Sequence, residues 1–447
     1  MSEITSNYLL SALLIFLWMI TFIWYQRKNS RFDAGSFIIV MYIVYAIFSI
    51  LTINDDSLPL LTNYKPLALF PYLYLYAMMM IAMSPSVYHH THPTEQIDYP
   101  HTNILKMTSV VIIMTSILLL PGFLSDFNNG FLSIFTDPEA GKNAYLEQAD
   151  GAATSGSAIR NLPAVIFNAL SDIAVFLLFY YLTMTKKNRK LIIGLTFAVI
   201  ISLAMPVVKG QRGGVVITSL TIMTGYFLFK QYLSKALTRR INKIGVVFLI
   251  IITLPVVAIT ISRFGTEKGD MSSFINWYVG QGNIYFNNHA LDNGGLRYGD
   301  RTLNLFKRIV DSNTSSNYVE RREKFSHIDI NDEVFSTFVG DFAIDFGPFF
   351  AFVLFVIFNL WVIASFQKYQ EDSKKIKIHQ LLLLYFTVCV SIQGGMTLFS
   401  FSDSGNLRII TLMLLYSYLI CHEDLLRKFP LVSNSSPEPP VQNDDIK

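Results

Sequence analysis

The sequence predicts an all-α integral membrane protein in which about eleven transmembrane helices form one polytopic bundle. Of the 447 residues, 52% are hydrophobic and only 15% are charged, and the mean hydropathy is +0.41. A soluble chain of this size would carry about 25% charged residues. The apolar residues gather in runs of roughly 17–25, the length that a helix needs to cross a hydrocarbon core of about 30 Å.

The apolar runs are separated by polar loops of very different lengths. The first run lacks a preceding basic residue and an obvious small-residue cleavage site, so it predicts a span rather than a cleaved signal. The ninth run is longer than one crossing requires, and we expect a half-helix followed by a full span. The runs lie near residues 8–24, 36–52, 66–84, 104–121, 163–183, 191–207, 214–229, 244–261, 336–366, 380–400 and 405–421.

Lysine and arginine are concentrated after alternate runs, which predicts the topology. Short loops rich in these residues face the cytoplasm, so we expect a periplasmic N-terminus and a cytoplasmic C-terminus. The formal net charge of +3 gives no sign of a nucleic-acid partner, and two cysteines imply no disulfide framework. The basic clusters are Arg27, Lys28 and Arg31; Lys186, Lys187, Arg189 and Lys190; Lys230, Lys235, Arg239, Arg240 and Lys243; and Lys368, Lys374, Lys375 and Lys377.

The sequence therefore predicts a single membrane domain over residues 1–430. A disordered cytoplasmic tail, rich in Pro, Ser and Asp, is expected over residues 431–447. Two long periplasmic loops are expected near 122–162 and 262–335, and loops of such length are usually functional. We expect the second loop to contain short helices and to form an ordered lid. Its stretch 274–289 interleaves aromatic residues with amides, which favours either carbohydrate contact or an interfacial aromatic belt.

Three arginines lie at the same predicted depth on the outer face. Arg212 sits in a glycine-flanked turn between two spans, Arg263 ends the eighth span, and Arg408 begins the eleventh. The planar guanidinium binds phosphate through two parallel hydrogen bonds, so the three could converge on one anionic group. The alternative for each is an interfacial arginine whose stem lies along apolar surface.

Acidic residues mark the start of the ninth span. Asp341 and Asp345 are four residues apart and share one helix face. Carboxylates at the edge of a span are costly and usually functional, one to partner an arginine and one to accept a proton. The alternative is charge complementarity with the helix dipole. Asp172, in the fifth span, fits a structural hydrogen-bond partner better, and His289 is a candidate general base or an ordinary loop histidine.

The predicted outer segments contain no zinc-ligand spacing, Asp-x-Asp pair or nucleophile elbow. His89, His90 and His92 lie in a predicted cytoplasmic loop without a partnering carboxylate or cysteine set. We therefore expect neither a metal nor a cofactor. The remaining chemistry uses arginines to stabilise a phosphate leaving group and a carboxylate to deprotonate a hydroxyl.

This plan resembles the Wzy-type O-antigen and capsule polymerases, the oligosaccharide repeat-unit polymerases. The shared features are the span number, the large late outer loop, a Gly-x-Arg-Gly turn at 210–213 and Asp-Phe-Gly at 345–347. The likeness covers nearly the whole chain as architecture and implies the fold of polytopic, GT-C-like glycosyltransferases. The resemblance implies that Arg212 and Arg263 correspond to the family's outer-loop arginines. It also implies that Asp341 and Asp345 correspond to the acidic residues at the start of the family's next long span, whereas Arg408 and His289 match less closely.

The resemblance implies polymerisation of polyprenyl-pyrophosphate-linked oligosaccharide repeat units at the periplasmic face of a bacterial inner membrane. A growing glycan on polyprenyl pyrophosphate would be the donor, and a hydroxyl of the incoming lipid-linked repeat the acceptor. An apolar groove between spans would hold the prenyl tails. Expected partners are membrane lipids, a repeat-unit flippase and a chain-length regulator.

Two other functions remain open. An O-antigen ligase uses the same donor with a lipid A-core acceptor and shares the membrane plan. A polysaccharide transporter or flippase usually has an even number of spans, twofold internal repeats and charges at mid-membrane.

Overall fold

The computed structural model consists almost wholly of helices. It describes residues 3–53, 64–100, 102–127, 158–208, 211–264, 271–311, 313–315, 318–331, 334–369, 374–393 and 403–428. Among these residues, nine helices are long and apolar enough to cross a membrane. The chain is therefore a polytopic helical membrane protein, as its sequence predicts. The predicted tail and most of the loop 122–162 lie outside the described residues.

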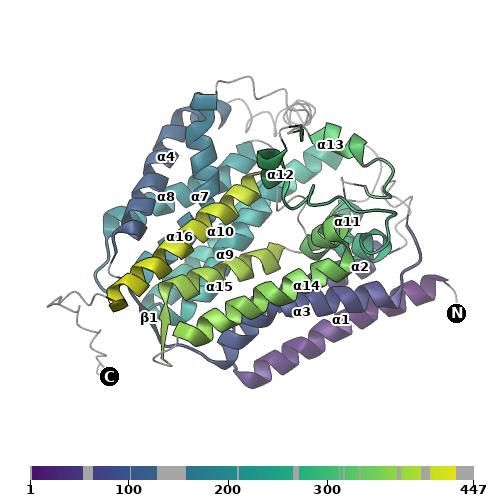
Figure 1. Ribbon diagram of the computed structural model, residues 1–447, viewed down its shortest axis with the longest axis horizontal. Coiled ribbons are helices and arrows are strands. Elements are labelled where there is room, and N and C mark those ends of the chain that lie inside the picture. The colour runs from purple at the N-terminus through teal and green to yellow at the C-terminus, as the bar shows by residue number, and fades with distance from the viewer. Residues whose placement is uncertain are drawn as a thin grey trace.

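Each predicted apolar run lies on one helix, with small differences at the ends (Figure 1). The nine candidate spans are all of these helices except α10 and α15. Residues 394–400 of the tenth run lie outside the part of the chain that the structure describes. The helices are α1 (Glu3–Lys28), α2 (Ala34–Thr52), α3 (Leu69–Thr91), α4 (Ile104–Asp126), α7 (Ala158–Thr183), α8 (Arg189–Val208), α9 (Arg212–Phe229), α10 (Lys235–Phe264), α14 (Thr337–Tyr369), α15 (Ile378–Gln393) and α16 (Asp403–Lys428).

The long ninth run forms two helical segments joined by a kink, as expected. Within α14, Gly347 has φ 78° and ψ 158°, a conformation that glycine adopts without steric cost. Pro348 follows, lacks an N–H and disfavours helical geometry at the preceding residue. Residues 337–346 therefore form a half-helix before the remainder of α14.

A short parallel sheet that the sequence did not predict joins two loops. β1 (Gln96–Asp98) pairs with β2 (Lys375–Lys377), so the segment after α3 lies beside the segment before α15. The Tyr99 hydroxyl donates to Thr183 at the end of α7, at 3.1 Å. Arg31 and Lys230 line one pocket nearby together with residues of the α3–α4 loop. All four basic clusters thus meet at one end of the bundle, which we call the basic end.

The third basic cluster was expected in a loop, but most of it lies in a helix. Lys230 belongs to the short 3₁₀ helix η4 (Lys230–Tyr232), and α10 begins at Lys235. Arg239, Arg240 and Lys243 are therefore helical. Leu233 and Ser234 alone separate the two helices, which leaves no room for a longer loop.

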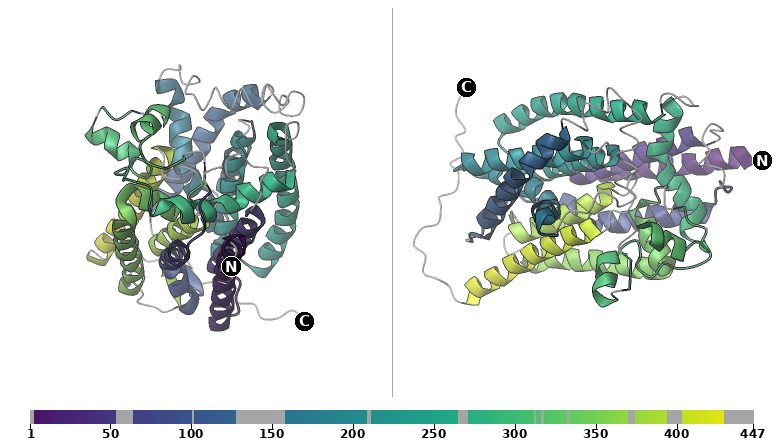
Figure 2. Two further views of the ribbon diagram at one scale, coloured as in Figure 1. Left: turned by 90° about the vertical axis from the view of Figure 1, so that its right-hand side faces the viewer. Right: turned by 90° about the horizontal axis from the view of Figure 1, so that it is seen from above.

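The opposite end, which we call the loop end, carries the segment 271–336. This segment contains α11 (Met271–Tyr285), the π-helical turn η5 (Phe286–Ala290), α12 (Asn304–Val310) and α13 (Tyr318–Lys324). The Ala68 amide, just before α3, donates to Asn287 at 2.9 Å, and the nearby Leu67 amide donates to Asn7 of α1. Figures 1 and 2 place α11 to α13 at the end where the N-terminus lies.

The start of α1 and the end of α16 therefore lie at opposite ends of the bundle. Glu423 of α16 forms ion pairs with Lys377 of β2 and with His379, 3.1 Å away, at the basic end. Asn7 of α1 binds the segment before α3 at the loop end. The eleven predicted spans, an odd number, would place the termini at opposite ends in this way.

Candidate functional site

The backbone of the outer segment binds the half-helix of α14 where the kink leaves carbonyls without helical donors. Pro348 has no N–H to give to the Ile344 carbonyl, four residues earlier. Arg297 donates its N–H to that carbonyl at 3.2 Å, and Tyr298 donates to the Asp345 carbonyl at 2.9 Å. The kink thus creates the docking position for residues 297–302.

Arg301 and Asp341 form an ion pair buried inside this junction. The Arg301 Nη2 atom lies 2.7 Å from Asp341 Oδ1, and Nε donates to the same oxygen at 2.9 Å. The Ser336 hydroxyl also donates to this oxygen, at 3.0 Å. Arg301 is only 2% exposed and Asp341 is fully buried. The sequence anticipated an arginine partner for one of the acids, but that partner is none of the three proposed arginines.

Asp345, one helical turn after Asp341 on α14, binds the same part of the outer segment. Its carboxylate accepts the Arg301 amide at 3.1 Å, and the Thr302 amide and hydroxyl, each at 2.7 Å. Asp341 and Asp345 share one helix face. Asp341 therefore binds the Arg301 side chain while Asp345 binds the backbone of Arg301 and Thr302. Both carboxylates are fully buried and have partners within the protein. These contacts hold the outer segment on the half-helix, and a catalytic role of the two acids stays a prediction.

The amides of the stretch 274–289 also bind the protein itself. Asn283 donates to the Ser49 hydroxyl at 3.2 Å, and Gln281 accepts the Phe335 amide at 3.2 Å. Asn287 both accepts from and donates to the backbone of Ala68. These contacts explain the amides through tertiary structure and fasten the predicted lid to α2 and to the segment before α3.

An apolar groove of about 270 Å³ lies between α14, α15 and α16, beside this junction. Phenylalanine side chains form much of its wall, and residues at and just before the start of α12 also line it. A groove of this composition suits a hydrocarbon chain. Its aromatic residues are Phe306, Phe338, Phe342, Phe355, Phe358 and Phe386.

Polar contacts tie α12 to the start of α16 beside the groove. Asn406 donates to the Thr302 carbonyl at 2.8 Å and accepts the Leu305 amide at 3.3 Å. Arg308 Nη2 lies 2.5 Å from Asp403 Oδ2, and both side chains are about one-third exposed. The partly exposed guanidinium of Arg308 thus lies near the apolar groove.

Arg408 lies on the neighbouring face of α16 and contacts α7. Its Nη1 atom is 3.7 Å from Asp172 Oδ1, and its Nε donates to the Asn168 carbonyl at 3.1 Å. The two charged side chains line a small cavity of about 50 Å³ that shares Phe338 with the groove. Asp172 is therefore a structural partner, as the sequence indicated, and Arg408 lies near the groove.

His289 lies in η5 and is 4% exposed. Its Nδ1 is 3.4 Å from Asp329 Oδ2, and Lys65 Nζ is 2.7 Å from the same oxygen. The hydrogen bond from Lys65 lowers the pKa of the Asp329 carboxyl, slight burial opposes this, and the charge of His289 lowers it further. A proton on Nδ1 directed at Asp329 makes Nε2 the basic nitrogen.

For Arg212 and Arg263 the structure describes only the position of the backbone. Arg212 is the first residue of α9, and Arg263 lies in the last turn of α10. A Cβ atom added at Gly213 would lie 3.2 Å from the Tyr278 hydroxyl, so the start of α9 adjoins α11. Their side chains fall outside the described part of the chain. The expected convergence with Arg408 stays a prediction.

The sequence reasoning missed several cations of the outer segment. Arg297 is 2% exposed and its guanidinium lies 5.2 Å from the centre of the Phe325 ring. Arg321 donates to the Asp300 carbonyl at 3.4 Å. The signal was the density of basic residues between 297 and 324 in a predicted outer loop, where positive charge is scarce.

Within the described residues, no group of three His, Cys, Asp or Glu side chains could hold a metal ion. His90, which the sequence placed in a loop without a partnering carboxylate, lies in the last turn of α3 and pairs with Asp33 at 2.7 Å. The site therefore offers cations, buried carboxylates, one histidine and an apolar groove.

Comparison with known protein families, with curated proteins and with solved structures finds no match for this chain. The functional argument accordingly depends on the geometry of the site.

Proposed function

We propose that this protein is a metal-independent glycosyltransferase that polymerises polyprenyl-pyrophosphate-linked oligosaccharide repeat units into a surface polysaccharide. The observation that carries the proposal is the apolar groove of about 270 Å³ beside cations at the loop end. A substrate with a long hydrocarbon tail and a charged, sugar-bearing head requires these two environments side by side. The location would be a bacterial inner membrane, with the loop end in the periplasm.

The groove would hold a prenyl tail. Its walls come mainly from α14, α15 and α16, and Thr302 and Asn406 are polar residues that also line it. Burial of apolar area contributes about 25 cal/mol for each Å², so a few isoprene units would bind with useful affinity. The pyrophosphate would then project toward α12 and the start of α16.

Arginines would bind the pyrophosphate. Arg408 lies beside the groove, and Arg212 and Arg263 are the further proposed contacts. Arg308 joins them because its side chain is about one-third exposed near the groove. Guanidinium groups that face developing negative charge stabilise the transition state more than the ground state.

His289 is the proposed general base. The acceptor hydroxyl would give its proton to Nε2 while its oxygen bonds to the anomeric carbon of the donor. The bond from that carbon to pyrophosphate oxygen would break, and the electron pair would leave with the pyrophosphate. Asp329 would stabilise the resulting imidazolium. Asp341 and Asp345 would act by holding the outer segment in place.

A strain that lacks the chain tests this function through its glycan ladder. Loss of long chains with retained single-repeat product is expected for a polymerase. Loss of both products would contradict the proposal and indicate a ligase or a flippase.

Complementation of this strain with variants tests the arginines. Arg212→Ala should leave mostly single-repeat product at normal protein levels, because chain extension should be about 10²–10³-fold slower. Arg212→Lys should restore extension only partly, because ammonium lacks the bidentate fork.

A further inference from the structure

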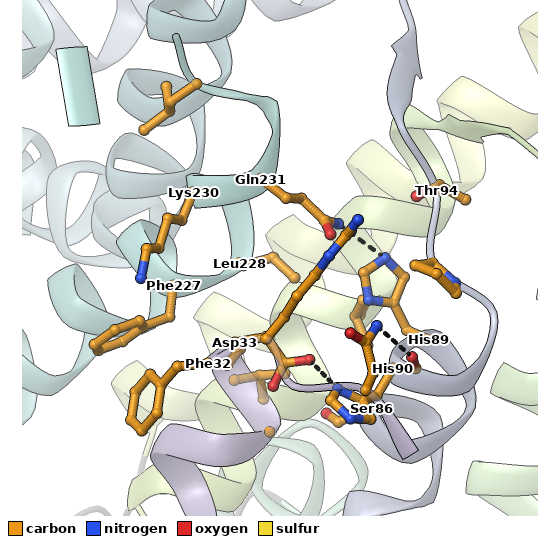
Figure 3. Close-up of a pocket in the computed structure, with 18 of the residues that line it drawn as sticks. Phe32, Asp33, Ser86, His89, His90, Thr94, Phe227, Leu228, Lys230 and Gln231 are labelled. Carbon is orange, nitrogen blue, oxygen red and sulfur yellow. Dashed lines mark hydrogen bonds and ion pairs between the residues drawn. The ribbon is translucent and has the colours of Figure 1, made fainter. Parts of the chain in front are cut away.

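A second cavity, of about 870 Å³, opens at the basic end. Its walls come mainly from the α1–α2 loop with the start of α2, the end of α3, the start of the α3–α4 loop, and the end of α9 with η4 and the first turns of α10. Leu384 and Val388 of α15 also line it. Figure 3 shows side chains of the α1–α2 loop, the end of α3, the α3–α4 loop, the end of α9 and η4 around one space, with Lys230 beside Phe227. The proposed glycosyl transfer makes no use of this cavity.

Four cations line the cavity: Arg31, Lys230, Lys235 and Arg239. Lys235 and Arg239 are four residues apart on α10 and share one helix face. Arg31, Lys235 and Arg239 are exposed, so they stand at the rim. Among the described residues, none of the four forms an ion pair with a carboxylate, whereas Arg301 and Arg308 at the loop end do.

The carboxylate inside the cavity already has partners within the protein. Asp33 accepts from the Ser36 amide at 3.0 Å and the Tyr25 hydroxyl at 3.1 Å, and it lies 2.7 Å from His90 Nδ1. Burial raises the pKa of Asp33, but the hydrogen bonds from His90 and Ser36 outweigh it and lower the pKa overall. Glu95 is the second acid, exposed at the edge. Cations therefore exceed acids around the opening.

Neutral donors and apolar side chains complete the lining. Asn29, Thr94 and Gln231 present polar groups, and the Gln231 amide lies 3.4 Å from His89 Nε2. Phe32 and the Phe227 ring meet with centroids 5.1 Å apart. Such a wall accepts the apolar part of a ligand while the rim cations bind its charge.

We propose that this cavity is a binding site for a phosphate-bearing anion. Lysine and arginine with neutral amide and hydroxyl donors are the groups that recognise phosphate. Two sources share this chemistry, a phospholipid headgroup and a soluble phosphate ester. The sequence predicts that this end is cytoplasmic, the side on which basic pockets between spans bind anionic headgroups. The proposal is independent of the glycosyltransferase function.

Binding to the full-length protein tests the proposal with two probes. The first is phosphatidylglycerol, titrated into nanodiscs of phosphatidylcholine, and the second is inorganic phosphate added to protein in neutral detergent. The increase in melting temperature gives the apparent Kd for each. Raising the salt concentration should weaken binding of either probe to the wild-type protein.

Two variants, Lys230→Gln and Arg239→Gln, should each weaken binding about fivefold, as expected for one surface cation. Arg189→Gln is the matched control, because Arg189 is exposed at the basic end but does not line the cavity. All three should melt like the wild type without ligand.

Stabilisation by phosphatidylglycerol alone assigns a lipid headgroup, and stabilisation by inorganic phosphate assigns a soluble ligand. Absence of both, or equal weakening by Arg189→Gln, would overturn the proposal.

Discussion

Arg301 is the residue on which the junction of the outer segment with α14 most depends. It is 2% exposed, and its side chain and backbone bind two carboxylates of the same helix face. A buried ion pair adds little net stability compared with apolar residues, but loss of one partner leaves an unpaired buried charge. The pair therefore specifies the position of the loop.

Asp341→Asn and Arg301→Met should each destabilise the protein by about 3–5 kcal/mol, because each leaves one buried partner uncompensated. The double variant Arg301→Met with Asp341→Leu should recover much of this loss, since it removes both charges together. Denaturant unfolding in detergent measures the difference. Single variants within about 0.5 kcal/mol of the wild type would show that the pair is not stabilising.

We predict that Asp329, at the loop end, makes a contribution to folding stability that depends on pH. Its folded pKa is lowered by the hydrogen bond from Lys65 and by the charge of His289. A lowered folded pKa gives stability that is present above the unfolded value, about 3.9, and is lost as the pH falls through the folded value. The melting temperature of Asp329→Asn should therefore fall below that of the wild type at neutral pH and converge with it in acid.

The matched control for this series is Glu323→Gln, an exposed acid of the same segment. It should melt like the wild type throughout. A difference between wild type and Asp329→Asn that grows toward acid would reverse the expected sign and contradict the assignment.

The sequence identified Asp341 and Asp345 because carboxylates are rare inside apolar runs. It could not identify Arg301 as their partner, since the contact spans 40 and 44 residues of sequence. Polar loop residues carry no periodic pattern that encodes such pairing. The amides of 274–289 illustrate the same limit, because their partners lie on α2 and before α3.

At the scale of elements, α11 is fixed by close approach to α2. The Ser49 hydroxyl donates to the Gly280 carbonyl at 2.8 Å. A Cβ atom at Gly280 would lie 2.4 Å from the carbonyl carbon of Phe48, so only glycine fits. The backbone contact makes α11 a packed part of the bundle and explains how it carries η5 and His289.

Gly280→Ala should destabilise the protein by about 1–3 kcal/mol and loosen α11, because the new methyl group meets backbone that cannot turn away. Limited proteolysis within 271–290 and thermal unfolding measure the effect. Gly245→Ala in α10 is the control, since a Cβ there meets nothing within 4 Å. If both alanine variants behave alike, close packing of α11 is not the cause.

The helices themselves were predictable, and so was the kink. Among the described residues, length and hydropathy located each helix of 16 or more residues, and the length of the ninth run indicated two segments. The strands β1 and β2 were not predictable, because each has three residues and the pairing joins positions 96 and 375. Contacts of that kind depend on which loops the bundle brings together.

At the scale of the whole molecule, the structure separates two kinds of charged site. Basic residues without carboxylate partners among the described residues gather around the cavity at the basic end. At the loop end, Arg301, Arg308 and Arg408 each contact an acid beside the apolar groove. The two proposed binding sites therefore differ in whether acids of the protein already accompany their cations.

Reporter fusions test the predicted orientation. A fusion after Lys428 should be cytoplasmic, because α16 ends near the basic end and short basic loops stay inside. An insertion near Asn313, between α12 and α13, should be periplasmic. The reverse result at both positions would place the loop end in the cytoplasm and exclude transfer of periplasmic substrates.

The most direct test of the central claim is chain extension by the purified protein in liposomes. The substrate is the lipid-linked single repeat that accumulates in the strain without this chain. We predict a ladder of products at whole multiples of the repeat, with release of polyprenyl pyrophosphate and no need for added metal. Folded protein that yields only the single repeat would contradict the account.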